Sequence, residues 1–309
     1  MKKRITALIL LLMLLTGCVK VPQAEAKLRI YTSFYPLYAM CGRLLQDVDD
    51  VSLNCLVQPQ DGCLRNYALS DWDFAILSEA DVVVIGGRGL ESFENTLYSL
   101  GDNGPAVLTA MQGLYLYQDS HIEQTSSEDS SHLSGANPYL YLSFSGASQI
   151  TEQLADALTE LLPTWSDRIQ QNDEALQMEI ASAKAVWDAA LADRSGKKVA
   201  VLCETAVYPA LDFGLQMAYQ LEREPGTTLF QEATDNLLQE LTDRDIKAVL
   251  LEQQAPADLV DSLTEAGFTP IKIDMLSSYP QDVGFDGYLT ALGRNAERID
   301  KAFQNQAER

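Results

Sequence analysis

The chain has 309 residues, of which 47% are hydrophobic and 21% are charged, a composition typical of globular proteins. This length suits two domains of about 150 residues each. The formal net charge of −22 argues against nucleic acid and anionic lipid headgroups as partners, because both repel an acidic surface.

Residues 1–17 have the pattern of a bacterial secretion signal. The start is basic, and the apolar run over residues 5–15 is shorter than the about 20 residues of a membrane span. The run LTGC at residues 15–18 resembles a lipobox, in which Cys18 is acylated and becomes the first residue of the mature protein. We therefore expect an extracytoplasmic lipoprotein, anchored to the bacterial cell membrane only by lipidated Cys18 through a tether over residues 18–26. The alternative is an ordinary secretory signal with a chance cysteine.

Residues 27–163 alternate strand and helix patterns and predict a first α/β lobe. Strand patterns lie at residues 27–33, 51–57, 81–87, 105–110 and 113–118, and helical patterns lie at residues 34–47, 71–80 and 146–162. Residues 118–135 are rich in Ser, Asp and Glu without periodicity, which predicts an acidic surface loop. This loop holds both histidines, His121 and His132, either as solvated residues or as a metal-scavenging pair.

A long amphipathic run from Ser166 to Asp193 predicts a helix within a bridging segment of residues 164–195. At the helical rise per residue it would be about 40 Å long, enough to join two lobes. The α/β pattern restarts in residues 196–309, with strands at 197–203, 214–222, 246–254 and 270–275 and helices at 234–244, 255–267 and 287–306. The predicted fold is therefore α/β with two lobes, each with a mainly parallel sheet, bridged by one long helix and enclosing a ligand cleft.

The pair Cys203-Glu204 follows the strand over residues 197–203. In open α/β sheets, ligands bind beyond the carboxyl ends of the strands, so this pair is expected at the cleft. It could supply a nucleophile, a metal ligand, or only a small core thiol followed by a polar turn. A cysteine nucleophile needs a base, usually histidine, and neither histidine is predicted nearby. We therefore expect no enzymatic activity.

The order and spacing of several segments resemble the solute-binding proteins of zinc and manganese ABC importers over essentially the whole mature chain. The segments that carry this resemblance are TSFYPLYAMCGRLL (32–45), LSEADVVVIGGRGLES (77–92), NPYLYLS (137–143), VLCETAVYPALDFGL (201–215) and GYLTALGRNAERIDKAF (287–303). The resemblance implies a receptor that binds a solute between its lobes and delivers it to an ABC permease and its ATPase. We expect a monomer.

Members of that family hold one divalent cation, usually with three histidines and a carboxylate. The resemblance places these four positions at Arg65, Tyr139, Glu204 and Asp274, with an offset of up to one residue at Arg65, and only Asp274 keeps the expected type. Tyr139, Glu204 and Asp274 could hold manganese or zinc through oxygen. Alternatively, the Arg65 guanidinium takes the place of the cation and pairs with Glu204 and Asp274, or the cleft binds a small solute that carries both charges.

Four cysteines remain after Cys18. Cys41 on the first helix and Cys55 on the next strand are close enough in the predicted fold to form a disulfide, which an extracytoplasmic location allows. Cys63 and Cys203 are both predicted near the cleft, where they could ligate zinc, form a disulfide between the lobes, or remain inert thiols.

Two functions follow from these patterns. The first is the extracytoplasmic solute-binding lipoprotein of a zinc/manganese-type ABC transporter. The second is a surface lipoprotein on the same scaffold that has lost its metal site and serves adhesion or protein contacts.

Overall fold

The computed structural model describes residues 28–57, 64–118, 136–221, 223, 226–276 and 282–307. The predicted signal peptide and tether with Cys18, the acidic loop beyond Gln118 with both histidines, and Cys63 lie outside the described residues. Within the described part of the chain, no helix is both long enough and apolar enough to span a bilayer.

The N-terminal lobe contains a parallel sheet with strand order β2-β1-β3-β4. Its strands are β1 (Leu28–Thr32), β2 (Val51–Cys55), β3 (Val82–Ile85) and β4 (Ala106–Thr109). All residues of β3 are buried, as expected for the apolar VVVI run of an inner strand. The helices of this lobe are α2 (Tyr35–Leu44), α3 (Asp71–Leu77) and α4 (Glu94–Leu100), with the 3-10 turns η1 (Leu64–Asn66) and η2 (Gly101–Asn103).

The prediction of a strand at residues 113–118 is wrong, because within this segment only Gln118 forms a β-bridge, to Ala136. The alternation that suggested a strand comes from packing, since Leu116 is buried while Tyr115 is 83% exposed. The segment leaves the sheet after β4 and crosses toward the second lobe, where the backbone N–H of Tyr117 donates to the Tyr208 hydroxyl at 3.0 Å.

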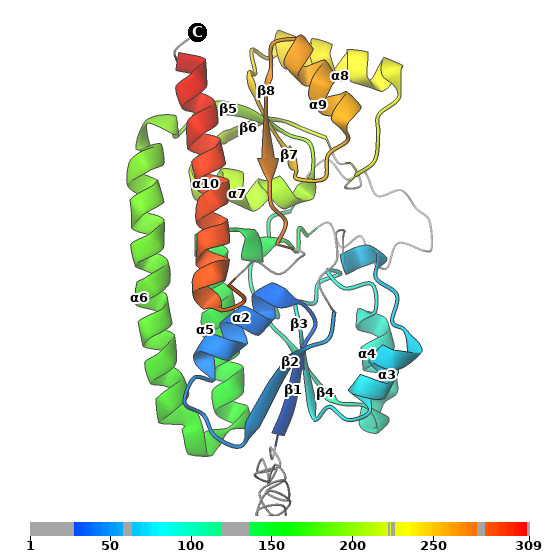
Figure 1. Cartoon of the computed structure of the whole chain (residues 1–309), viewed down its shortest axis with the longest axis vertical. Coiled ribbons are helices and arrows are strands. Elements are labelled where there is room, and N and C mark those ends of the chain that lie inside the picture. The colour runs from blue at the N-terminus through cyan, green and yellow to red at the C-terminus, as the bar shows by residue number, and fades with distance from the viewer. Residues whose placement is uncertain are drawn as a thin grey trace, which may run out of the picture.

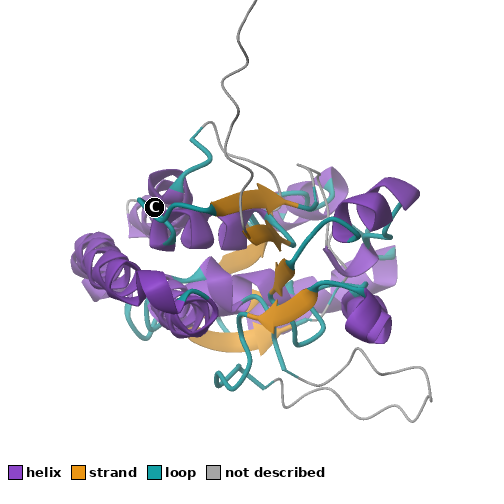
Figure 2. Ribbon diagram, turned by 90° about the horizontal axis from the view of Figure 1, so that it is seen from below, coloured by secondary structure: helices purple, strands orange, loops and turns teal. Residues whose placement is uncertain are grey.

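The C-terminal lobe repeats the plan of the first. Its parallel sheet has the order β6-β5-β7-β8, so in both lobes the first strand lies between the second and the third. The strands are β5 (Lys198–Val201), β6 (Gln216–Gln220), β7 (Ala248–Glu252) and β8 (Thr269–Ile273). The helices are α7 (Val207–Asp212), α8 (Gln231–Asp243) and α9 (Ala257–Glu265), and η6 (Glu204–Ala206) precedes α7. Helices flank both sheets (Figure 2), which confirms the predicted α/β class.

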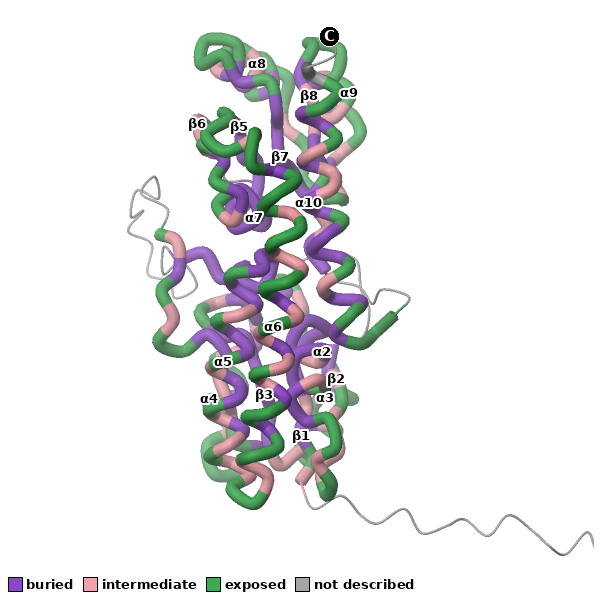
Figure 3. Tube along the Cα trace, turned by 90° about the vertical axis from the view of Figure 1, so that its left-hand side faces the viewer, coloured by how far each residue is buried: buried purple, intermediate pink, exposed green. Residues whose placement is uncertain are grey.

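A helical spine joins the lobes. It consists of η3 (Leu140–Leu142), α5 (Phe144–Leu161), η4 (Pro163–Trp165), α6 (Ser166–Leu191), η5 (Ala192–Arg194) and α10 (Phe285–Ala307). Figure 1 shows α6 running beside both lobes, as the long amphipathic run predicted. Buried residues of α2, α5, α6 and α10 belong to one core cluster with residues of both sheets, and Figure 3 shows the buried chain continuing through the middle of the molecule.

Side chains also tie the two lobes together near the middle of this spine. The Tyr35 hydroxyl donates to the Gly284 carbonyl at 3.2 Å, and the Tyr288 hydroxyl donates to the Tyr141 carbonyl. Burial raises the pKa of the Tyr288 hydroxyl well above its ordinary value, so that it remains a donor. The C-terminal ends of both sheets therefore face each other across a closely packed junction.

Candidate functional site

Three of the four site residues predicted from the sequence meet at this junction. Arg65 lies on η1 after the first lobe's second strand, and Glu204 begins η6 directly after the end of β5. An Arg65 guanidinium nitrogen lies 2.9 Å from a Glu204 carboxylate oxygen, and both side chains are about one-fifth exposed. The guanidinium carbon lies 5.5 Å from the centre of the Tyr139 ring, which is buried beneath it. An ion pair between the lobes, backed by an aromatic face, thus occupies the predicted site.

The turn that carries Arg65 is held by the loop after β3. In that loop the backbone N–H of Ser92 donates to the Leu64 carbonyl at 3.3 Å, and the Ser92 hydroxyl donates to the Tyr67 carbonyl. On the other side of the turn, the Tyr67 hydroxyl donates to a carboxylate oxygen of Asp73 at 3.0 Å. The turn that carries Arg65 is therefore held by hydrogen bonds to Leu64 and Tyr67.

Glu91, next to Ser92, fixes this loop from inside the lobe. Its carboxylate is fully buried and accepts from the Ser33 hydroxyl at 2.7 Å and from the backbone N–H groups of Gly86 and Gly87 at 2.7 and 2.9 Å. Burial raises the pKa of this carboxyl, while its three donors oppose the shift. Glu91 connects the ends of β1 and β3 to the loop that supports the Arg65 turn.

The fourth predicted residue, Asp274, follows β8. One of its carboxylate oxygens accepts from the backbone N–H of Leu276 at 2.9 Å, so the side chain closes its own turn. The Asn295 amide on α10 holds the Asp274 backbone, accepting from its N–H at 2.9 Å and donating to its carbonyl at 3.0 Å. The segment reaches the site through its next residue, Met275, whose carbonyl accepts from the Tyr141 hydroxyl at 3.4 Å.

Cys203 is a core residue, and the prediction that it is a cleft thiol is wrong. Its side chain is 1% exposed, and its sulfur lies 3.0 Å from the Thr205 hydroxyl. Burial raises the pKa of the thiol to about 12, and metals bind the thiolate. Cys203 therefore packs in the core, whereas the side chain of the next residue, Glu204, is about one-fifth exposed and faces the site.

The possible disulfide between Cys41 and Cys55 is not present in the structure. Cys41 is fully buried in the core face of α2, and burial raises its pKa to about 12. The Cys55 thiol donates instead to the Val57 carbonyl at 3.4 Å. Adjacent elements in the fold therefore did not bring the two sulfurs together.

The donors at this site do not match a family-type metal centre. Across the described ranges, no group of three or more His, Cys, Asp or Glu residues could hold a metal ion. Glu204 forms an ion pair with Arg65, and the fixed positive charge of Arg65 repels a divalent cation.

A second ion pair lies at the end of β7. The Arg223 guanidinium donates to both carboxylate oxygens of Glu252 at 2.6 and 2.7 Å, and both side chains are almost completely buried. The backbone N–H of Gly226 also donates to this carboxylate, at 2.8 Å. Glu252 therefore fastens the segment after β6 to the sheet and is not open to a ligand.

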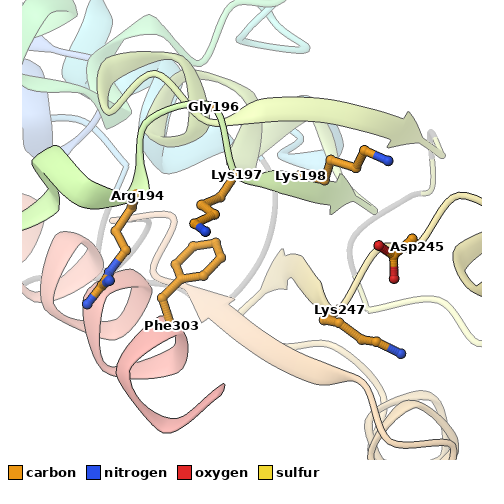
Figure 4. Close-up of a pocket in the computed structure, with 7 residues that line it drawn as sticks. All are labelled: Arg194, Gly196, Lys197, Lys198, Asp245, Lys247 and Phe303. Atoms are coloured by element: carbon orange, nitrogen blue, oxygen red, sulfur yellow. The ribbon is translucent and has the colours of Figure 1, made fainter. Parts of the chain in front are cut away.

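A pocket of about 470 Å³ lies at the opposite edge of the C-terminal sheet, where β5 and β7 begin. Its lining is basic, but Figure 4 shows the cationic groups spread around it, with Lys197 near the Phe303 ring and Lys198 and Lys247 away on the other side. Arg194 is turned toward α10, where its guanidinium lies 3.4 Å from Asp300. These groups do not converge on one point, and the pocket is separate from the ion-pair site.

Comparisons with known proteins point to one family. The family model described as zinc-uptake complex component A, periplasmic, matches residues 30–302. The zinc-binding lipoprotein AdcA of Streptococcus pneumoniae is 22% identical over 297 residues, which cover 92% of this chain and 58% of that protein. The chain thus spans little more than half the length of the curated relatives it matches first.

Solved structures share the fold. The solute-binding protein FpvC of Pseudomonas aeruginosa in complex with Mn²⁺ superposes with a TM-score of 0.75 at 20% identity, covering 91% of this chain and 99% of that one. The laminin-binding protein Lmb of Streptococcus agalactiae, described as bifunctional with adhesin and metal-transporting activity, has a TM-score of 0.70 at 19% identity and covers 89% and 98%.

Proposed function

Because the chain belongs to the family of the periplasmic component A of zinc-uptake complexes, we propose that it is the extracytoplasmic solute-binding component of a metal-type ABC importer. It binds its cargo, a cation or a small solute, between the lobes and delivers it to a permease driven by an ATPase. The family match over residues 30–302 and the two-lobed fold support this function.

The observation that carries the proposal is the ion pair between the lobes. Arg65 and Glu204 stand at two of the positions to which the resemblance assigns metal ligands, and they neutralise each other at 2.9 Å. The guanidinium fills the place of a bound cation, as the Tyr139 ring face beneath it favours a positive charge. Cargo that enters this cleft must either displace Arg65 from Glu204 or carry charged groups that pair with Arg65 and Glu204 in place of each other.

Replacing Arg65 tests this arrangement. Wild-type protein is expected to show little thermal stabilisation by Zn²⁺ or Mn²⁺, whereas Arg65→His supplies a neutral imidazole beside Glu204 and Tyr139. A ligand at one hundred times its dissociation constant stabilises the native state by about 2.7 kcal/mol, so metal binding would be plainly visible. Arg43→His is the matched control, because Arg43 pairs with Glu179 at 2.8 Å outside the site. Tight stoichiometric Zn²⁺ binding by the wild type, lost in Glu204→Ala, would contradict the replacement of the cation by Arg65 and would instead support a metal site of the family type with altered ligands.

We propose further that the protein is a lipoprotein anchored through Cys18. The basic start, short apolar run and LTGC sequence support this anchor, and relatives such as AdcA are named lipoproteins. A fatty-acid probe should label the wild type and leave Cys18→Ala unlabelled. Equal labelling of both proteins would rule the anchor out.

An adhesion role is the second candidate. It is supported by the fold shared with Lmb and by two aromatic side chains that α3 presents to solvent, Trp72 at 73% and Phe74 at 39% exposure. If these residues bind a protein partner, replacing both with alanine should abolish binding to immobilised laminin without changing stability. Absence of laminin binding by the wild type would remove this candidate.

A further inference from the structure

Asn137 lies at the crossing point between the two lobes. It is 5% exposed, and its backbone N–H donates to the Tyr117 carbonyl at 2.8 Å. Its own carbonyl accepts from the Tyr208 hydroxyl on α7 at 2.7 Å. Burial raises the pKa of the Tyr208 hydroxyl to about 12, so that it remains a protonated donor. The backbone of Asn137 is thus fixed from both sides.

The Asn137 side chain joins two of the site residues directly. Its amide oxygen accepts from the backbone N–H of Tyr139 at 2.9 Å, and its amide nitrogen donates to the backbone carbonyl of Glu204 at 2.8 Å. Tyr139 directly precedes η3, the first element of the helical spine, while Glu204 starts η6 in the second lobe. One buried amide therefore connects the two backbones from which the ring and the carboxylate of the site project.

This connection requires an amide. The side chain must accept at one end and donate at the other, which Asn does and an ionised Asp of the same shape does not. A carboxylate would face the Glu204 carbonyl with no donor between them, in surroundings where an unmade hydrogen bond is costly.

We propose that Asn137 is the positioning residue of the site, which sets the separation of Tyr139 and Glu204 so that the Arg65 guanidinium fits against both. The inference rests on the proposed function only in taking this site as the ligand cleft. Its test uses the ion pair itself as the readout and needs no cargo.

The first experiment compares Asn137→Asp with Asn172→Asp. Asn172 is the matched control, because it is also buried and donates to two backbone carbonyls, those of Leu44 and Gln46, away from the site. Each variant should lower the melting temperature at neutral pH by about 5 °C. Asn137→Asp should recover toward mildly acidic pH, because its protonated carboxyl regains the one missing donor. Asn172→Asp should recover only in part, because one O–H replaces one of two N–H donors.

The sign of this pH dependence follows from the environment of the introduced carboxyl. Burial and the facing carbonyl raise the pKa of this carboxyl in the folded state above its unfolded value. The loss of stability caused by the substitution is therefore absent below the unfolded pKa and grows as the pH rises through the folded pKa. The charged groups of the site, Arg65 and Glu204, already form a pair and largely cancel. The Tyr208 phenol stays neutral over this range, because burial raises its pKa to about 12.

The second experiment measures the coupling between Arg65 and Glu204 by a double-mutant cycle of Arg65→Gln and Glu204→Gln at neutral pH. In the wild-type and Asn172→Asp backgrounds, the decreases in melting temperature caused by Arg65→Gln and by Glu204→Gln should not add, because both substitutions remove the same ion pair. In the Asn137→Asp background the two decreases should add, because Arg65 and Glu204 no longer form their ion pair in the correct geometry.

The outcomes separate positioning from general stabilisation. Unchanged coupling in Asn137→Asp would overturn the proposal, and so would loss of coupling in Asn172→Asp. If Asn137→Asp does not fold at neutral pH, the cycle is run in Tyr208→Phe, where weaker coupling than in the wild type is expected and unchanged coupling contradicts the proposal. Failure of the protein to bind any transported solute would count against the proposed function alone, since the coupling is measured without cargo.

Discussion

Replacing Glu204 with glutamine tests whether the ion pair between the lobes contributes to stability. The substitution keeps the length and shape of the side chain and removes only its charge. It removes the ion pair between Glu204 and the Arg65 guanidinium, which is about four-fifths buried. We expect Glu204→Gln to lower the free energy of unfolding and to reduce its dependence on salt.

The magnitude follows from distance and burial. At 2.9 Å and an effective dielectric constant of about 20, the attraction is about 6 kcal/mol before desolvation is subtracted. Fully exposed pairs contribute about 0.2–1 kcal/mol, and breaking fully buried pairs costs about 3–5 kcal/mol. A pair with one-fifth of each side chain exposed lies between these limits, so we expect a loss of about 2 kcal/mol.

Urea unfolding at neutral pH, followed by circular dichroism at low and high salt, measures this loss. Glu240→Gln is the control, because Glu240 pairs with Arg244 at 2.8 Å but both side chains are nearly half exposed. Burial predicts less than about 0.5 kcal/mol for this helical pair. Equal losses in the two variants, or no loss in Glu204→Gln, would refute the reasoning that burial makes the pair between the lobes the stronger one.

Two further predictions concern the core. Cys41 and Cys203 should resist alkylation in the native protein at mildly alkaline pH and react after unfolding, because burial raises both thiol pKa values to about 12; rapid native labelling of either would contradict their placement. Gly146→Ala should cost about 3 kcal/mol or more of unfolding free energy, since the added carbon would lie 1.9 Å from the Leu140 carbonyl oxygen. Gly42→Ala, inside α2 with its nearest neighbour at 3.6 Å, should instead stabilise by up to about 1 kcal/mol; similar denaturation midpoints for the two variants would be inconsistent with this packing.

The fold could be predicted from the sequence where local pattern and tertiary packing agree. The VVVI run of β3 is buried on both faces, and the long run from Ser166 forms α6. Two short helices, α4 and α7, gave no such signal. Neither has a side-chain cap at its start, and α7 contains Pro209 within its six residues.

The site was predictable only in part. Family resemblance indicated Arg65, Tyr139 and Glu204, because the matching segments place three of the family's ligand positions at these residues. It could not show that Cys203, one residue from Glu204, faces the core. The role of Asn137 left no sequence signal, because its amide bonds the backbone of a residue 67 positions away. The contacts of Ser92 with the Arg65 turn are likewise set by tertiary packing.

The central claim is that Arg65 fills the place of the cation in this cleft. Native mass spectrometry combined with elemental analysis of the protein, purified without chelators, tests it most directly. We predict no stoichiometric zinc or manganese in the wild type and one bound divalent ion in Arg65→His exposed to the same metals. One tightly held zinc or manganese ion per wild-type chain, lost on Glu204→Ala, would contradict the account.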